Sequence, residues 1–245
     1  MILALIPSRL NSKRLKQKPL LKIDKLPMII HTLKRTQLAK KIDRVIVCTD
    51  SIKIKKLVEM YDGESVLTSN VHKNGTERIA EVAIKFKNIE LIVNVQGDEP
   101  LISPLEIDKV IEFHKKNKNF DIVVPVVKTK SFLENSLIKT VFDVNGKVIY
   151  FSRLPIPYNY TNKSKAIYFK DLSIVSFKPK SLKKFASLRS SKLEISEGIE
   201  LLRAIENNMN IGTFEIKGSH FPVNVKNDFL KALEVMPKDK YRKLY

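Results

Sequence analysis

The sequence predicts an α/β fold in which helices cover a mostly parallel, mixed sheet. Short apolar runs alternate with helical segments of about ten residues, which is the pattern of βαβ units. In addition, the apolar run 89–93 leads into Gly97, Asp98 and Glu99, so carboxylates follow a buried strand. Open α/β sheets bind ligands at the carboxyl ends of their strands, and we expect these carboxylates at that edge.

The first half of the chain alternates between strand and helix. A helix is predicted over 27–38 because Ile29, Ile30, Leu33 and Leu38 fall on or near one face. The expected strands are 2–6, 44–48, 65–67, 91–95 and 121–127, and the expected helices are 27–38, 52–61, 76–87 and 104–116.

The second half has a different pattern, which predicts a β-rich section inserted into the α/β domain. Asn145 and Gly146 separate the runs 137–143 and 147–151, and this pair is a strong hairpin signal. A polar stretch at 155–164 precedes two β-rich runs within 165–177, helices at 181–188, 196–207 and 227–236, and a strand at 211–216. We expect one domain over 1–245, with the inserted section at about 137–190.

Composition narrows the class of protein. The 245 residues are 43% hydrophobic, which is enough for a large core. No apolar run approaches the ~18 residues of a membrane-spanning helix, and the N-terminal apolar segment is too short for a signal peptide. The single cysteine, Cys48, lies in a predicted strand and excludes internal disulfides. We therefore expect a cytoplasmic protein without membrane insertion.

The charge balance is strongly basic, with 45 Lys and Arg against 26 Asp and Glu and a net charge of +19. A field of this sign favours anionic partners. The basic residues are spread along the chain without a stripe or a nucleic-acid-binding signature, so no nucleic-acid partner is expected. Compositional bias would produce the same excess of lysine, and the charge alone is weak support for an anionic small substrate.

A basic loop follows the first predicted strand. Its charged residues are Arg9, Lys13, Arg14, Lys16 and Lys18. Triphosphates bind after the first strand in doubly wound folds, so this loop is a candidate phosphate site. It lacks the glycine spacing of a Walker A loop. A solvated basic loop is the alternative interpretation.

Two further segments have the residue types of a nucleotide site. Gln96 offers an amide and Asp98 a hard oxygen for Mg²⁺, although a solvated acidic turn is the alternative. Arg78 falls in the first turn of a predicted helix that Thr76 is placed to cap. A cation at that position opposes the helix dipole, which favours a ligand-binding role for Arg78.

Four segments together resemble the 3-deoxy-manno-octulosonate cytidylyltransferases, and the resemblance covers nearly the whole chain. They are 7–20, beginning Pro7-Ser8-Arg9, then Gly75-Thr76-Glu77-Arg78, Val95-Gln96-Gly97-Asp98-Glu99-Pro100, and Tyr150-Phe151-Ser152-Arg153. The resemblance implies a Rossmann-like nucleotidyltransferase fold. It also implies a homodimer whose interface is formed by the inserted β-rich section.

The activity implied by the resemblance is transfer of CMP from CTP to the anomeric hydroxyl of an acidic sugar, with release of pyrophosphate. The implied roles place Pro7, Ser8, Arg9, Arg78 and Gln96 at the cytosine end, Arg14 and Lys18 on the triphosphate, Asp98 on Mg²⁺, and Arg153, Asp171 and Glu200 near the sugar acid. Phosphoryl-type transfer depends mostly on positioning and on charge stabilisation, which these residue types supply.

The chain departs from the family pattern near the sugar and at one metal ligand. Asn224 stands where the family has a second aspartate, so it offers Mg²⁺ a neutral oxygen at best. Asp171 replaces a histidine, and Leu201 replaces a glutamine beside Glu200. An apolar side chain cannot make the hydrogen bonds of an amide.

These departures lead to a hypothesis about the acceptor. Asp171 would repel a carboxylate but would suit an amine, so the acceptor is 3-deoxy-manno-octulosonate or a modified relative such as an amino-substituted one. Two alternatives stay open. One is a nucleotidyltransferase for another acidic sugar or nucleotide, and the other is a catalytically impaired protein that binds a sugar nucleotide.

Overall fold

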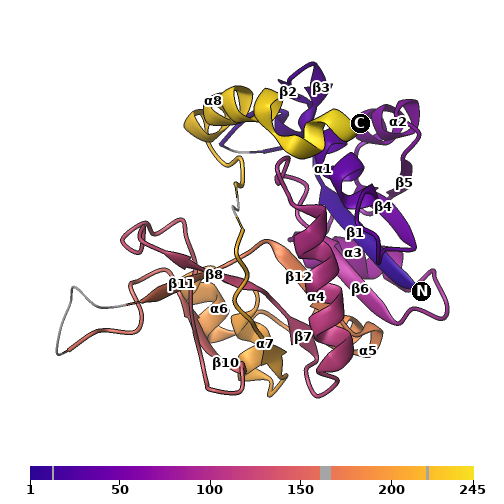
Figure 1. Cartoon of the computed structure of the whole chain (residues 1–245). Coiled ribbons are helices and arrows are strands. Elements are labelled where there is room, and N and C mark those ends of the chain that lie inside the picture. Colours follow the sequence, from indigo (N-terminus) through magenta and orange to yellow (C-terminus); the bar gives the residue numbers. More distant parts are fainter. Residues whose placement is uncertain (13, 161–166, 219–220) are drawn as a thin grey trace.

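A central sheet organises the molecule. The computed structural model describes residues 1–12, 14–160, 167–218 and 221–245 (Figure 1). The sheet has seven strands in the order β13-β7-β12-β6-β1-β4-β5. Their bounds are β1 Ile2–Ser8, β4 Arg44–Thr49, β5 Glu64–Leu67, β6 Leu91–Val95, β7 Ile122–Val123, β12 Ile174–Phe177 and β13 Ile211–Gly212. All neighbours are parallel except β12, which runs antiparallel to β6 and β7, so the predicted mostly parallel, mixed sheet is confirmed.

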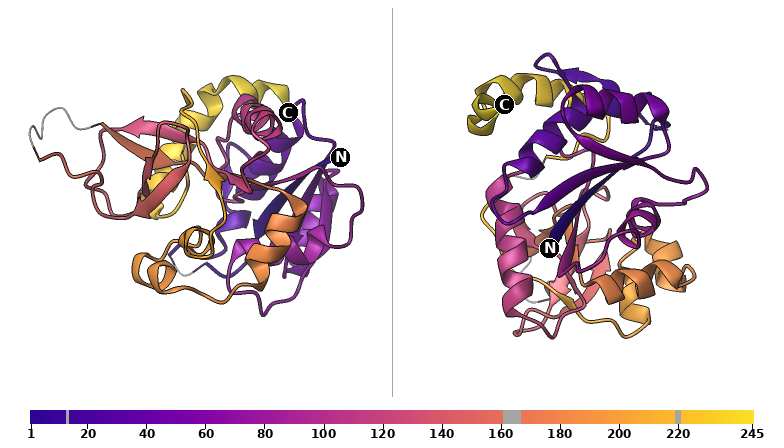
Figure 2. Two further views of the ribbon diagram at one scale, coloured as in Figure 1. Left: turned by 90° about the horizontal axis from the view of Figure 1, so that it is seen from below. Right: turned by 90° about the vertical axis from the view of Figure 1, so that its right-hand side faces the viewer.

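Helices lie on both sides of this sheet (Figure 2). In β1, Ile2, Ala4 and Ile6 face one apolar cluster while Leu3 and Leu5 face the other, as the two-residue period of a strand requires. The first cluster includes residues of α1 Met28–Gln37, α2 Ile52–Met60 and α4 Pro104–Lys116, and the second includes residues of α3 Gly75–Ala83, α5 Pro179–Ser187 and α7 Leu202–Glu206. The sheet is therefore buried on both faces.

A second, four-stranded antiparallel sheet stands beside the first. Its order is β10-β9-β11-β8, with bounds β8 Val126–Thr129, β9 Lys139–Phe142, β10 Val148–Ser152 and β11 Tyr168–Asp171. The strands β9 and β10 form the hairpin expected at Asn145 and Gly146, and Gly146 has a φ of 75°. Residues 161–166, between β10 and β11, lie outside the described residues. They include the end of the polar stretch expected at 155–164 and the start of the β-rich range 165–177.

The C-terminal segment covers the end of the molecule that carries the short hairpin of β2 Lys22–Ile23 and β3 Leu26–Pro27 (Figure 1). It begins at Val223 and comprises α8 Lys226–Val235 and the 3-10 turns η3 Met236–Lys238 and η4 Lys240–Leu244. The short helix α6 Lys192–Glu197 lies further upstream in the chain. Ala232 and Met236 pack against Ile23, Met28 and Leu101 in a third apolar cluster. Another 3-10 turn, η1 Lys18–Leu20, ends the loop after β1.

Several predicted boundaries are wrong for identifiable reasons. The single strand expected at 121–127 is two strands, β7 and β8, which belong to different sheets and are separated by Val124 and Pro125. The helix expected at 196–207 is divided between α6 and α7 at Gly198, whose φ of 64° is left-handed. The helix expected to reach residue 87 ends at Ala83, and β13 covers only Ile211–Gly212 of 211–216. The range 137–190 also includes β12, a strand of the central sheet.

Candidate active site

The topology places a crevice at the carboxyl ends of β1 and β6. From β1 the chain continues to β4 and β5 on one side and returns to β6 on the other, which makes this a switch point of the sheet. A cavity of about 540 Å³ lies there. Its lining residues are Pro7, Ser8, Arg9, Ser12, Arg14, Lys18, Pro19, Met28, His72, Lys73, Asn74, Gly75, Arg78, Gln96, Gly97, Asp98 and Glu200.

Nine of the predicted site residues share this cavity. They are Pro7, Ser8, Arg9, Arg14, Lys18, Arg78, Gln96, Asp98 and Glu200. They come from the end of β1 and the loop after it, from α3, from the turn after β6 and from the segment before α7, so four distant parts of the sequence converge. Lys13 of the same basic loop lies outside the described residues.

The turn after β6 is held close to the end of β1. A Cβ added to Gly97 would lie 2.7 Å from the carbonyl oxygen of Pro7, a distance that real Cβ atoms do not reach. Only glycine permits this approach. The contact fixes Gln96 and Asp98 beside the first residues of the basic loop.

Asp98 is paired with Lys18 and joined to the C-terminal segment. The Lys18 ammonium donates to Asp98 Oδ2 at 2.7 Å and to the carbonyl of Val223 at 2.8 Å. The backbone N–H of Val223 donates to the Asp98 carbonyl at 2.9 Å, and Arg14 Nη2 donates to Asn224 Oδ1 at 3.0 Å. Asn224 does not line the cavity but lies directly beside the residues that do.

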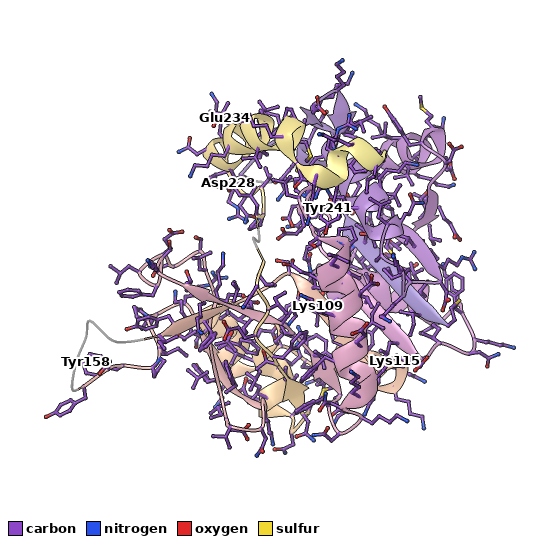
Figure 3. All side chains as sticks on the ribbon, viewed as in Figure 1. Lys109, Lys115, Tyr158, Asp228, Glu234 and Tyr241 are labelled. Atoms are coloured by element: carbon purple, nitrogen blue, oxygen red, sulfur yellow. The ribbon has the colours of Figure 1, made fainter. Side chains whose placement is uncertain are left out.

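Asp228 secures this segment at the start of α8 (Figure 3). One of its carboxylate oxygens accepts the backbone N–H groups of Asn224 at 2.8 Å and Val225 at 3.0 Å. Asp228 is therefore a residue of the first turn of α8 whose carboxylate caps the backbone that leads into the helix.

The donor set at this position fits a hard cation such as Mg²⁺. Asp98 offers a carboxylate oxygen and Asn224 an amide oxygen, both of which suit that ion. Among the described residues, no group of three or more His, Cys, Asp or Glu side chains is placed to hold a metal ion. Such a set cannot enclose a cation by itself, but Mg²⁺ in nucleotide sites uses one or two protein oxygens together with phosphates and water.

Arg78 is fixed by a network of its own. It is 3% exposed, and its guanidinium donates to Asp50 at 2.8 Å, to the carbonyl of Ser69 at 3.2 Å and to the hydroxyl of Thr68. The expectation that Thr76 caps α3 is wrong. Asn74 is the N-cap residue and accepts the backbone N–H of Glu77 at 2.8 Å.

Thr76 instead links α3 to the segment before α7. Its hydroxyl donates to Glu200 Oε2 at 2.6 Å. Burial raises the pKa of Glu200, and the Thr76 hydrogen bond opposes that rise. Leu201, at the position of the missing glutamine, is 9% exposed and packs in the core of the α3 side.

His72 is a lining residue to which the sequence interpretation gave no role. Its Nε2 lies 2.5 Å from a carboxylate oxygen of Glu81, which also accepts the backbone N–H of Ser69 at 2.9 Å. The pKa of Glu81 is lowered because these hydrogen bonds outweigh the effect of its burial. Lys73, Asn74 and Gly75 also line the cavity. Their position just before Arg78 in the sequence is the feature from which their place in the site could have been predicted.

Two predicted sugar-binding residues lie outside the cavity. The Arg153 guanidinium donates to three backbone carbonyls, those of Asn135, Glu197 and Gly198, and so joins the second sheet to the end of α6. Asp171 ends β11, where its backbone pairs with Val126 and Ile138. Cys48 is buried in β4, and burial raises the pKa of its thiol, which excludes a nucleophilic role.

Comparison with known proteins identifies the family. A model of the cytidylyltransferase family matches residues 3–211. The curated 3-deoxy-manno-octulosonate cytidylyltransferase of Leptospira interrogans is 35% identical over 243 residues, which are 98% of each chain. That of Rickettsia prowazekii is 38% identical over 240 residues, covering 96% of this chain and 94% of the relative.

Solved structures agree with this similarity. A CMP:2-keto-3-deoxy-manno-octonic acid synthetase complexed with CTP has a TM-score of 0.92 at 31% identity and covers 97% of this chain and 98% of its own. A 4-diphosphocytidyl-2C-methyl-D-erythritol synthase from Anaerococcus prevotii shares the fold, with a TM-score of 0.63 at 16% identity and 96% of each chain covered. The fold is thus that of a nucleotidyltransferase. The chain belongs to the cytidylyltransferase family, and within that family its similarity is to the 3-deoxy-manno-octulosonate enzymes. Among the described residues, no helix has the length and apolar character needed to cross a membrane.

Proposed function

We propose that the protein transfers CMP from CTP to the anomeric hydroxyl of 3-deoxy-manno-octulosonate or a modified relative, releasing pyrophosphate. One observation carries this proposal. Three of the four segments that resemble the family contribute eight residues of predicted function to a single cavity at the switch point of the sheet, and Glu200 joins them there. The product would be an activated acidic sugar for cell-surface polysaccharide synthesis in the cytoplasm.

The cavity supports an assignment of roles along the nucleotide. Pro7, Ser8, Arg9, Arg78 and Gln96 would hold the cytosine end, where the end of β1 meets Gly97. Arg14 and Lys18 would neutralise the triphosphate from the basic loop. A net charge of +19 would attract a substrate of this kind over a longer range.

Asp98 would hold Mg²⁺, with Asn224 as a neutral oxygen ligand beside it. When bound, the cation would neutralise charge on the phosphate oxygens and align them for substitution. In the transfer, the anomeric oxygen forms a bond to the α-phosphorus of CTP, and the bond from that phosphorus to the pyrophosphate oxygen breaks. The hydroxyl proton leaves with solvent or a nearby base. Arg14 and Lys18 stabilise the charge that develops on the departing pyrophosphate.

We also propose roles at the sugar for three residues, Arg153, Asp171 and Glu200. The structure supports the role of Glu200 more directly than the other two. Glu200 lines the cavity and has one hydrogen bond, to Thr76, that fixes its carboxyl group. Arg153 would contact the sugar only if it exchanged a backbone carbonyl partner for the substrate carboxylate. Asp171 would favour an amino-substituted acceptor only if that sugar reached the end of β11.

A pyrophosphate-release assay tests the proposed function. The enzyme is incubated with CTP, Mg²⁺ and a panel of acidic sugars that includes plain and amino-substituted 3-deoxy-manno-octulosonate. Release that requires CTP and one of these two sugars supports the proposal, and their ratio identifies the acceptor. A clear preference for the plain sugar removes the argument from Asp171. Binding of CTP by calorimetry without release from any sugar identifies the catalytically impaired alternative.

We also propose a homodimer formed through the second sheet. Exposed apolar side chains of this sheet and of its adjoining loops include Leu133, Ile149, Leu154 and Tyr158, which are 74%, 55%, 64% and 71% exposed. Figure 3 shows Tyr158 projecting away from the body of the molecule. Exposed apolar side chains of this kind occur in protein interfaces. Sedimentation equilibrium measures the mass directly, and a monomer would contradict the proposal.

A further inference from the structure

The two cations expected to hold the triphosphate are bound to the two side chains expected to hold the metal. Lys18 lies on Asp98 at 2.7 Å and Arg14 lies on Asn224 at 3.0 Å. The Lys18 side chain is 12% exposed and that of Asp98 is 27% exposed. This inference rests on the proposed function, because it concerns the same nucleotide and metal site.

Lys18 has the contacts of a resident counter-ion. Its ammonium bridges the Asp98 carboxylate and the carbonyl of Val223, and so ties the turn after β6 to the C-terminal segment. The backbone bond from Val223 to Asp98 holds the same two segments together without Lys18. The segments can therefore remain docked when the ammonium leaves.

A lysine and a divalent cation cannot both be neutralised by one carboxylate. At a few ångströms such charges repel each other strongly in a partly buried site. The neutral amide of Asn224 adds no negative charge to compensate. A cation arriving alone would thus have to displace Lys18 from Asp98 without offering it a new partner. A triphosphate offers that partner.

We propose that Lys18 occupies the metal position of Asp98 until a triphosphate draws it away, so that metal and nucleotide are bound as a unit. Arg14 makes the same exchange between Asn224 and the phosphates, with a smaller effect because Asn224 is neutral. The site then has low affinity for a free divalent cation. It takes up the cation together with CTP.

The proposal predicts opposite effects of one substitution on two ligands. In Lys18→Gln, Asp98 is freed, so the affinity for a divalent cation in the absence of nucleotide rises by about tenfold or more. The affinity for CTP falls by about tenfold, because a phosphate contact is lost. A lysine with a purely structural role would not tighten metal binding when it is removed.

Titration of Mn²⁺, followed by the electron paramagnetic resonance signal of the free ion, measures metal binding without activity. Wild type, Lys18→Gln and Lys16→Gln are each titrated with and without CTP. Lys16 is the matched control, since it is exposed in the same loop and does not line the cavity. Circular dichroism verifies the fold, and Arg14→Gln, which frees Asn224, provides a second variant with the same expected direction.

The expected result is weak Mn²⁺ binding by wild type and Lys16→Gln, and tighter binding by Lys18→Gln, all without CTP. Equal Mn²⁺ affinities of the three proteins without CTP overturn the proposed exchange. Tight Mn²⁺ binding by wild type in the absence of CTP overturns it as well. Failure of wild type to bind CTP with Mn²⁺ present overturns the proposed function instead. The two failures are therefore distinguishable.

Discussion

At the scale of single residues, Arg78 shows how a sequence argument and a structure complement each other. Its place in the first turn of α3 opposes the helix dipole, and this favoured a ligand-binding role. The structure adds that the guanidinium is held by Asp50, Thr68 and Ser69, so its position is fixed in advance of any ligand. Asp50 directly follows β4 and is a positioning residue for the cavity.

We predict that Asp50→Asn weakens CTP binding more than it slows the chemical step. The substitution removes the charge that orients Arg78 and leaves a buried guanidinium with a weaker partner, at a cost of about 1–3 kcal/mol. The KM for CTP should rise by about tenfold with a smaller change in kcat. Asp43→Asn is the control, because Asp43 accepts a backbone N–H from Ile2 away from the cavity. A fall in kcat at constant KM would contradict the positioning role.

His114 predicts a dependence of stability on pH. Its Nδ1 lies 2.8 Å from Ser176 Oγ and its Nε2 lies 3.2 Å from the carbonyl of Phe120, in a buried position. Burial lowers its pKa from 6.5 to about 4, although the bond to Phe120 opposes this. Between these values the unfolded chain binds the proton and the folded chain does not. Stability is therefore fully present above pH 6.5 and is lost as the pH falls toward 4.

Urea unfolding of wild type and His114→Asn at pH 7 and pH 5 tests this sign. The variant should be less stable at pH 7, since a buried hydrogen-bonded ring is lost. Between the two pH values, however, wild type should lose about 2 kcal/mol more than the variant. His31, whose pKa is also lowered to about 4, is present in both proteins and cancels in the difference. An equal loss in both would show that His114 titrates normally.

At the scale of elements, the spacing of apolar residues predicts a strand or helix correctly where that element buries one regular set of side chains against the sheet. The strands β1, β4 and β6 and the helices α1, α2 and α4 were predicted to within a few residues, because their apolar spacing follows from their contacts with the sheet. Loops at the carboxyl ends of β1 and β6 then followed from the parallel order. This is why seven of the nine predicted residues share one cavity, whereas Arg78 and Glu200 reach it from α3 and from the segment before α7.

The errors occur where a long-range contact or a single backbone angle decides the structure. The run 121–127 is continuously apolar, yet Pro125 lies between two strands of different sheets, and proline does not donate in a ladder. The helical pattern of 196–207 contains Gly198 in a left-handed conformation, which ends α6. The role of Arg153 at the sugar stays a prediction, and its motif did not indicate that the guanidinium donates to carbonyls from two distant segments. Periodicity contains none of this information.

At the scale of the whole molecule, the C-terminal segment contacts residues of the site at one end and is anchored far from the site at the other. Arg35 of α1 is fully buried and donates to the hydroxyl of Tyr245 at 3.1 Å, to the carbonyl of Ile102 at 3.3 Å and to the carboxylate of Asp239. Arg242 donates to Asp24 in the β2–β3 hairpin at 2.6 Å. These contacts hold α8, which in turn presents Val223 and Asn224 to the cavity residues.

We predict that loosening this anchor weakens nucleotide binding at a distance. Arg35→Met leaves Asp239 without its buried partner and should lower the free energy of unfolding by about 3 kcal/mol or more. It should also reduce the affinity for CTP with Mg²⁺, because the backbone bond from Val223 to Asp98, which keeps Asn224 beside the proposed metal position, is weakened. Arg44→Met is the control. Arg44 pairs with Glu64 on the surface, with both side chains more than a third exposed, so its loss should cost less than about 1 kcal/mol and leave CTP affinity unchanged.

Urea unfolding measures the free energy of unfolding of both variants, and calorimetric titration measures their affinity for CTP. A destabilised Arg35→Met protein that binds CTP as wild type does would show that the anchor supports the fold but not the site.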